Sequence, residues 1–157
     1  MRIGQGYDVH PFEAGRRLVL GGVELAGETG LAGHSDGDAL THAVIDALLG
    51  AAALGDIGSH FPSTDESLRG ADSIELLRRV VRLVVAAGYD IVNLDATLVA
   101  QKPRMAPHID AMRRRLCDAL GTDVAKISVK ATTTDHLGFI GREEGLAAQA
   151  IVLLEER

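Results

Sequence analysis

Residues 2–10 alternate between large apolar side chains and small or polar ones, which is the pattern of a β-strand with two different faces. Ile3, Tyr7 and Val9 share one face, and two glycines, Asp8 and His10 share the other. Because residues two apart on a strand project to the same side, Asp8 and His10 are predicted to lie together, with the glycines leaving room beside them.

The rest of the chain alternates between helical and strand periodicity. The predicted segments are a hairpin with a Gly-Gly turn over 17–25, helices over 37–54, 73–87 and 107–121, and strands over 90–100, 125–131 and 145–154. Ser35 or Asp36 is the predicted N-cap of the first helix. The last strand is apolar on both faces, which is typical of a central strand or of one at a subunit interface.

This order of elements predicts an α+β fold, specifically a ferredoxin-like two-layer sandwich. Helices would cover one face of a mixed four-stranded sheet, with a small β-hairpin beside it. The sequence contains no internal repeat, linker or low-complexity segment, so we expect a single domain over residues 1–157.

Composition excludes several classes of function. A formal net charge of −6 argues against a nucleic-acid partner, and 3% aromatic residues argue against base-stacking surfaces. Cys117 is the only cysteine, so the chain forms neither an internal disulfide nor a cysteine-based zinc site. The N-terminus does not resemble a signal peptide and no apolar run has transmembrane length, so we expect a cytoplasmic protein without a membrane partner.

A third candidate ligand lies on the first predicted helix. His42, brought beside Asp8 and His10, would complete a donor set of two nitrogens and one oxygen, which suits Zn²⁺ and leaves a fourth position open for catalysis. Asp38 and Asp46 lie one helical turn from His42 on either side, where a carboxylate can accept the second imidazole N–H. Alternatively, both acids are solvated residues on the helix surface, and Asp8 and His10 are ordinary strand residues without a metal-binding role.

Three further segments have the chemistry of phosphate binding. Residues 132–135 offer three hydroxyls, turn amides and an acid directly after a strand, although a capped turn has the same composition. Lys102 and Arg104 flank Pro103 in an otherwise acidic protein, although basic loops are commonly just solvated. His34-Ser35 precedes a helix N-terminus, where the helix dipole favours anions. Zinc, hydroxyls and cations around one pocket indicate phosphoryl transfer.

Several motifs together resemble those of the 2-C-methyl-D-erythritol 2,4-cyclodiphosphate synthases, zinc enzymes of the non-mevalonate isoprenoid pathway. They cover essentially the whole chain, in order: Asp8-Val9-His10, His34-Ser35-Asp36-Gly37-Asp38, LGAAALGDIG at 49–58, Phe61-Pro62, KATTT at 130–134, and Gly141-Arg142.

The resemblance implies an intramolecular reaction. In 4-diphosphocytidyl-2-C-methyl-D-erythritol 2-phosphate, the 2-phosphate attacks the β-phosphorus, a cyclic diphosphate forms and CMP leaves. Tethering makes the attack unimolecular, so orientation supplies much of the barrier reduction. Without the resemblance, the alternatives are a zinc phosphohydrolase with an activated water, or a non-catalytic nucleotide-binding module.

The resemblance also implies a role for each matching residue. Asp8, His10 and His42 bind Zn²⁺, and His34 and Thr133 position phosphates and stabilise the transition state. The implied substrate-binding residues are Asp8, His10, His34, Ser35, Asp56, Ile57, Gly58, Phe61, Pro62, Ser63, Thr64, Asp65, Ala100, Gln101, Lys102, Pro103, Arg104, Met105, Ala106, Thr132, Thr133, Thr134, Asp135, Phe139 and Arg142.

Within that set, 56–58 and 61–65 face the methylerythritol, 100–106 the cytidine and 132–135 the diphosphate. Asp135 is the expected ligand of a second divalent cation, Mg²⁺ or Mn²⁺, although the family more often has Glu there. The family forms homotrimers with active sites at subunit interfaces, and Phe139 and Arg142 match a central cavity that can hold an isoprenoid diphosphate. Ser63 and Glu143 depart from the common residues at their positions.

Overall fold

The computed structural model describes residues 1–157 and has a mixed sheet centred on β7 (Gly145–Glu156). β7 pairs antiparallel with β1 (Arg2–Glu13) on one side and with β5 (Tyr89–Val99) on the other. β6 (Ile127–Thr132) adds parallel to β5, and the two-residue β4 (Gly30–Leu31) pairs with the end of β1. The predicted central position of the last strand is confirmed, and β4 is the only addition to the predicted four strands.

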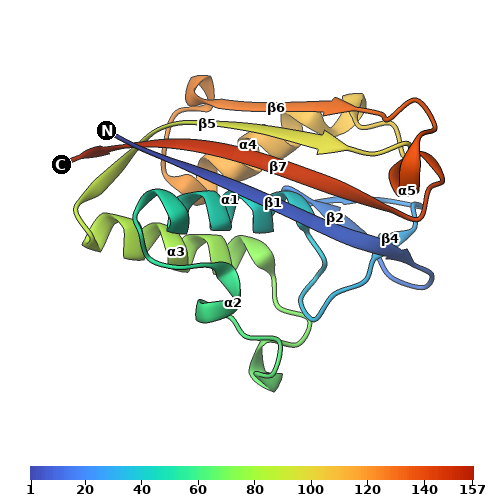
Figure 1. Ribbon diagram of the computed structural model, residues 1–157, viewed down its shortest axis with the longest axis horizontal. Helices are drawn as coiled ribbons and strands as arrows, with labels where there is room; N and C mark the ends of the chain where they lie inside the picture. Colours follow the sequence, from blue (N-terminus) through green and yellow to red (C-terminus); the bar gives the residue numbers. More distant parts are fainter.

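The three long helices, α1 (Ala39–Ala51), α3 (Ser73–Ala86) and α4 (Ile109–Leu120), lie on one face of this sheet (Figure 1). The remaining elements are the hairpin β2 (Leu18–Leu20) and β3 (Val23–Leu25), the four-residue helices α2 (Ile57–His60) and α5 (Gly138–Gly141), and 3₁₀ turns at Glu66–Leu68, Ala106–His108 and Val124–Lys126. The predicted α+β class is confirmed. No helix has the length and apolarity needed to cross a membrane.

The backbone of α1 lies directly on β1, and two glycines make this possible. A Cβ atom at Gly4 would lie 1.9 Å from the carbonyl oxygen of Ala47, and one at Gly6 would lie 1.8 Å from that of Ala43. The room that these glycines leave is therefore filled by the helix. This close approach brings a helical side chain within reach of the strand's polar face.

The N-terminus of α1 differs from the prediction. Neither Ser35 nor Asp36 is the N-cap; Asp38 is, and its fully buried carboxylate accepts hydrogen bonds from the N–H and the hydroxyl of Thr41. The same carboxylate accepts the N–H groups of Gly21 and Gly22 in the hairpin turn, at 2.9 and 2.7 Å. Burial, and then the charge of Asp36, raises the pKa of Asp38 against these donors. The Asp38 side chain is thus neither solvated nor bonded to the His42 ring, and it links the hairpin to α1.

The other face of the sheet carries no helix and is partly apolar. Ile3, Tyr7, Val9 and Ile151 expose 71, 52, 39 and 47% of their surface there. Ile151 lies opposite Gln5 in the β1–β7 register, so it shares the face of the odd-numbered β1 residues. An uncovered apolar patch on a sheet is typical of a surface that contacts another protein chain.

Candidate metal centre

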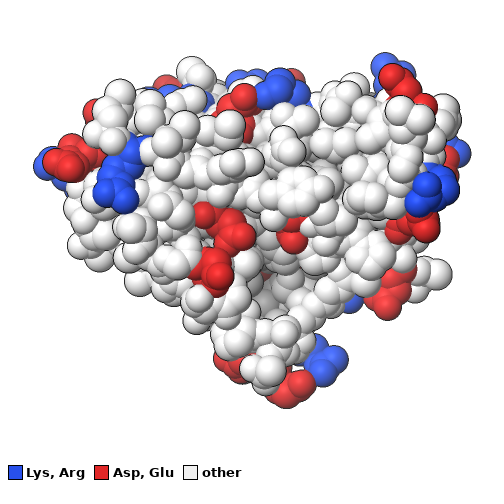
Figure 2. All heavy atoms as spheres, viewed as in Figure 1, with Lys and Arg blue, Asp and Glu red and all other residues white.

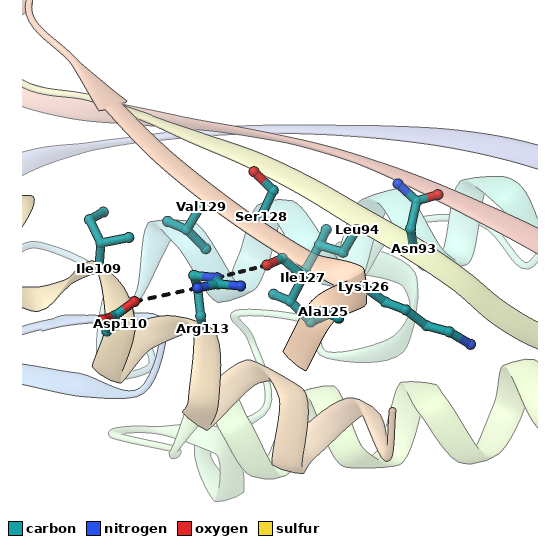
Figure 3. Close-up of a pocket in the computed structure, with 10 residues that line it drawn as sticks. All are labelled: Asn93, Leu94, Ile109, Asp110, Arg113, Ala125, Lys126, Ile127, Ser128 and Val129. Atoms are coloured by element: carbon teal, nitrogen blue, oxygen red, sulfur yellow. Dashed lines mark hydrogen bonds and ion pairs between the residues drawn. The ribbon is translucent and has the colours of Figure 1, made fainter. Parts of the chain in front are cut away.

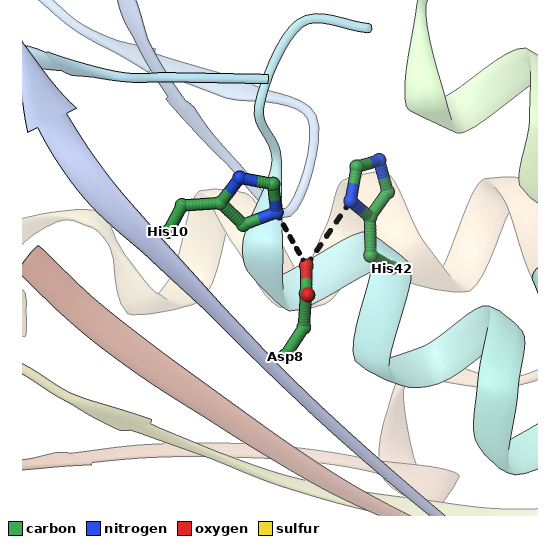
Figure 4. Close-up of side chains that lie close together, drawn as sticks. All are labelled: Asp8, His10 and His42. Atoms are coloured by element: carbon green, nitrogen blue, oxygen red, sulfur yellow. Dashed lines mark hydrogen bonds and ion pairs between the residues drawn. The ribbon is translucent and has the colours of Figure 1, made fainter. Parts of the chain in front are cut away.

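Asp8, His10 and His42 converge at the junction of β1 and α1 (Figure 4). Asp8 Oδ2 lies 2.6 Å from Nε2 of His10 and 3.1 Å from Nδ1 of His42. One potential ligand atom from each residue lies within 4.8 Å of the other two. The predicted pairing of Asp8 and His10 on one strand face, and their meeting with a helical imidazole, are therefore present in a single chain.

Each imidazole uses one nitrogen to bond the surrounding protein. Nδ1–H of His10 donates to the carbonyl oxygen of Ala32 at 2.5 Å, and Nε2 of His42 lies 2.8 Å from Oγ of Ser73 and 3.1 Å from Oγ of Ser35. The remaining nitrogens, Nε2 of His10 and Nδ1 of His42, both face Asp8. The ring orientations are thus fixed by hydrogen bonds of the nitrogens that face away from Asp8, as in known metal sites.

The electrostatics of the group favour a cation at its centre. Burial opposes ionisation of Asp8, but hydrogen bonds and charge from His10 and His42 outweigh it and hold the pKa of Asp8 below its usual value. Burial likewise disfavours the charged form of His10, yet the bond to Asp8 and its charge raise the pKa of this imidazole. The carboxylate therefore attracts positive charge to the space between the three side chains.

The donor set fits a divalent metal ion. Zinc ligands lie about 2.0–2.2 Å from the ion, so neighbouring tetrahedral donors are about 3.3–3.5 Å apart. The separations of 2.6 and 3.1 Å from Asp8 Oδ2 require outward shifts of less than about 1 Å. Two nitrogens and one oxygen are a set that zinc accepts, and they leave a fourth position free.

A cavity of about 230 Å³ opens beside this group. Its lining residues are Asp8, His10, His34, Ser35, His42, Ile57, Gly58, Phe61, Ser63, Leu68 and Leu76. The space-filling view shows a hollow on this side of the molecule with acidic side chains near its rim (Figure 2). Of the predicted residues in the neighbouring loops, Asp56, Pro62, Thr64 and Asp65 are exposed outside the lining, and the Asp65 carbonyl oxygen lies 2.8 Å from Nε2 of His34.

A second cavity, of about 340 Å³, lies at the carboxyl ends of β5 and β6. It is lined by 100–106 together with Ala131, Thr132 and Thr133, and it shares no lining residue with the first cavity. Predicted cytidine and phosphate segments therefore meet each other, but they do not meet the metal group within this cavity. Thr134 and Asp135 lie outside the lining, and the Asp135 N–H donates to Oγ1 of Thr133 at 3.2 Å.

Near α5, the neighbouring residues Arg142 and Glu143 do not pair with each other. Glu143 lies 3.3 Å from Nζ of Lys102, whereas Arg142 pairs with Glu144 at 2.9 Å. Phe139 is 40% exposed. Glu143, which differs from the residue common in the family, thus contacts Lys102 in the basic loop rather than Arg142.

Three residues that sequence reasoning missed hold the site in place. Ser73 contacts His42, Asp36 contacts Ser73, and Arg16 donates to the carbonyl oxygens of Gly33 and Ser35 at 2.6 and 2.7 Å.

Asp46, the expected partner of His42, accepts the Ile57 N–H at 2.7 Å instead. Burial raises the pKa of Asp46 against that bond. Contacts between distant segments leave no periodic signal that could have revealed them.

A further cavity, of about 420 Å³, lies between α4 and the strands β5 and β6 (Figure 3). Arg113 reaches across it, donating to the Ile127 carbonyl oxygen at 2.8 Å and pairing with Asp110 at 3.4 Å. None of the predicted site residues lines it. The Arg113 bond to Ile127 links α4 to β6, so we assign these polar groups a structural role.

Comparison with known proteins gives one consistent result. The sequence matches the YgbB family over residues 1–155. It is 61% identical to the 2-C-methyl-D-erythritol 2,4-cyclodiphosphate synthase of Thioalkalivibrio sulfidiphilus, over 99% of this chain and 97% of that protein. It is 58% identical to the synthase of Geobacter sulfurreducens, over all of both chains.

Solved structures agree in fold. The bifunctional IspDF from Campylobacter jejuni matches with a TM-score of 0.96 and 44% identity over 99% of this chain, which spans 42% of that longer protein. A CDP complex of IspF from Plasmodium falciparum matches with a TM-score of 0.87 and 34% identity, over 99% of this chain and 96% of that one. The chain therefore belongs to the YgbB family of 2-C-methyl-D-erythritol 2,4-cyclodiphosphate synthases, lyases of the non-mevalonate isoprenoid pathway.

Proposed function

We propose that this chain cyclises 4-diphosphocytidyl-2-C-methyl-D-erythritol 2-phosphate at a zinc site formed by Asp8, His10 and His42. The observation that supports this most strongly is the convergence of these three side chains beside the cavity that His34 and Ser35 line. Bound zinc would supply Lewis-acid polarisation of a phosphate oxygen.

The residues of the first cavity would bind and orient the tethered nucleophile. His34 and Ser35 offer a ring nitrogen and a hydroxyl to the phosphates, and Ile57 and Gly58 lie where the methylerythritol would bind, flanked by Asp56 and by 61–65. With both ends of the substrate held, the 2-phosphate oxygen is directed at the β-phosphorus and the bond to CMP breaks. Holding the two groups in line lowers the barrier through orientation.

The second cavity would hold the leaving nucleotide. Residues 100–106 surround a space that suits cytosine and ribose, and Lys102 and Arg104 supply positive charge for the phosphate of departing CMP. Thr132 and Thr133 line the same cavity, where the Thr133 hydroxyl would stabilise charge on the β-phosphate. Asp135, with Thr134 beside it, would hold Mg²⁺ or Mn²⁺ near the phosphates.

The separation of the two cavities supports an active site shared between copies of the chain. We propose a homotrimer in which the metal cavity of one subunit meets the nucleotide cavity of another. The uncovered apolar sheet face, with Ile3, Tyr7 and Ile151, supports such an assembly. Phe139 and Arg142 would then line a central cavity for an isoprenoid diphosphate. The proposal also includes a single domain over residues 1–157 and a cytoplasmic location.

Product analysis in ¹⁸O-labelled water tests the proposed reaction. We expect CMP and a cyclic diphosphate without ¹⁸O, because the nucleophile is the substrate's own phosphate. A zinc phosphohydrolase would incorporate ¹⁸O from water, and a nucleotide-binding module would release no CMP while still being stabilised thermally by CDP. Either result would contradict the proposal.

A further inference from the structure

We propose that Ser73 and Asp36 act as positioning residues that fix the ring nitrogen with which His42 binds metal, a role that rests on the proposed metal site. Neither residue lines the metal cavity. Both lie behind His42, at the junction of the loop before α1 and the first turn of α3.

The three residues form a continuous chain of polar contacts. Ser73 is fully buried, and its Oγ lies 2.8 Å from Nε2 of His42 and 2.5 Å from Oδ1 of Asp36. The Ser73 N–H donates to the other Asp36 oxygen at 2.9 Å. A buried hydroxyl held between a carboxylate and an imidazole has no freedom to point elsewhere.

The direction of these hydrogen bonds follows from the groups themselves. An ionised carboxylate only accepts, so the single Ser73 hydroxyl hydrogen is donated to Asp36. The Ser73 oxygen must then accept from His42, which places the ring proton on Nε2. In the neutral ring that a metal ion requires, Nδ1 then carries the lone pair, and this nitrogen faces Asp8 and the metal position. The relay therefore selects the tautomer that binds metal and, through the charge of Asp36, strengthens the ligand.

A second serine provides an internal comparison. Oγ of Ser35 lies 3.1 Å from the same nitrogen, but the only other hydrogen bond it forms is a long one, at 3.4 Å, from the Gly37 N–H. No carboxylate fixes the direction of its hydroxyl, so it does not determine the tautomer. Ser35 also lines the cavity and remains free to contact a ligand.

Zinc affinity of the whole protein, measured by competition with a chelator, tests this proposal. We expect Ser73→Ala to bind zinc about 10- to 100-fold more weakly, the usual effect of removing a group that orients a ligand. Asp36→Asn, which keeps the shape but removes the charge, should weaken binding about tenfold. With Co²⁺ as the probe, the visible absorption of Ser73→Ala should also shift.

Two control variants separate positioning from structural support. Asp72→Ala removes the N-cap of α3, whose carboxylate accepts the Ile74 N–H at 2.9 Å, without touching His42. Ser35→Ala removes the other hydroxyl. Both should keep zinc affinity within about threefold, and thermal melts of the metal-free proteins confirm folding.

The possible failures are distinguishable. Equal weakening in Ser73→Ala and Asp72→Ala would show a merely structural role and overturn the relay. Wild-type affinity in folded Ser73→Ala and Asp36→Asn would overturn it as well, while leaving the metal site intact. If His42→Ala binds zinc as tightly as the wild type, both the proposed metal site and the relay are overturned.

Discussion

The metal cavity and the nucleotide cavity differ in how much of their geometry one chain supplies. In the metal cavity, each imidazole is bonded from behind, and the helix that carries His42 is fixed by the buried carboxylate of Asp38. At the nucleotide cavity, the Thr133 and Asp135 side chains are exposed and bond mainly each other. A single chain therefore preorganises the metal site more completely than the phosphate end.

Removing a metal ligand should have the largest effect, and it should act on the metal cavity alone. His42→Ala should lose bound zinc and lower turnover at least about a thousandfold, because a Lewis acid contributes several kcal/mol to charge stabilisation. The fold should survive, since His42 lies off the apolar stripe of α1 and its ring contacts Asp8, Ser35 and Ser73 rather than the hydrophobic core. Metal analysis with circular dichroism checks both points, with His108→Ala, a histidine at the start of α4 outside the metal group, as control. Full zinc content in His42→Ala would contradict the ligand assignment.

The rigidity of the metal side depends on Asp38. Asp38→Ala should lower the free energy of unfolding by about 3 kcal/mol, because it removes a helix cap and leaves the Gly21 and Gly22 N–H groups without their acceptor. Urea unfolding measures this change. Asp65→Ala, which removes the exposed cap of a 3₁₀ turn, should cost less than about 1 kcal/mol. Equal losses would mean that Asp38 does not hold the site together.

The nucleotide side should respond in activity without a change in metal content. Thr133→Val keeps the shape but removes the hydroxyl, and kcat should fall about 100-fold, as when one charge-stabilising donor is lost. Zinc content should equal that of the wild type. Ser128→Ala, on the exposed side of β6, the strand that ends just before Thr133, is the matched control. A parallel loss of zinc in Thr133→Val would show that the two cavities are not independent.

The smallest effect concerns Asp46, which lies on α1 one turn after His42 but bonds the α2 segment. Because its carboxylate accepts the Ile57 N–H, Asp46→Ala should raise KM about tenfold by loosening the methylerythritol side. Zinc affinity should stay within about threefold. Chelator competition beside steady-state kinetics distinguishes this from direct support of His42, which would weaken zinc binding and leave KM unchanged.

Local patterns predicted the parts of this molecule that depend on periodicity. Alternation along 2–10 identified the faces of β1 and hence the Asp8–His10 pair, and the apolar stripe of the first helix placed His42 outside the main core. The apolar last strand is central, as expected. Each of these features repeats at a fixed spacing along the chain, so the sequence reveals it directly.

Contacts between distant segments were not predictable in this way. Asp38 is buried because four donors from the hairpin and from Thr41 surround it, and its sequence neighbours show none of this. Ser73 reaches His42 only because α3 packs beside α1. Gly4 and Gly6 allow the backbone of α1 to pack against β1, and this role likewise depends on tertiary packing.

An anomalous-scattering map at the zinc edge, from crystals grown with zinc and soaked in CDP, shows whether Asp8, His10 and His42 bind the metal. We expect one strong peak per chain, bonded to an Asp8 carboxylate oxygen, Nε2 of His10 and Nδ1 of His42 at about 2.0–2.2 Å. The fourth position should face the cavity lined by His34 and Ser35. A peak held by other side chains, or none at the junction of β1 and α1, would contradict this assignment.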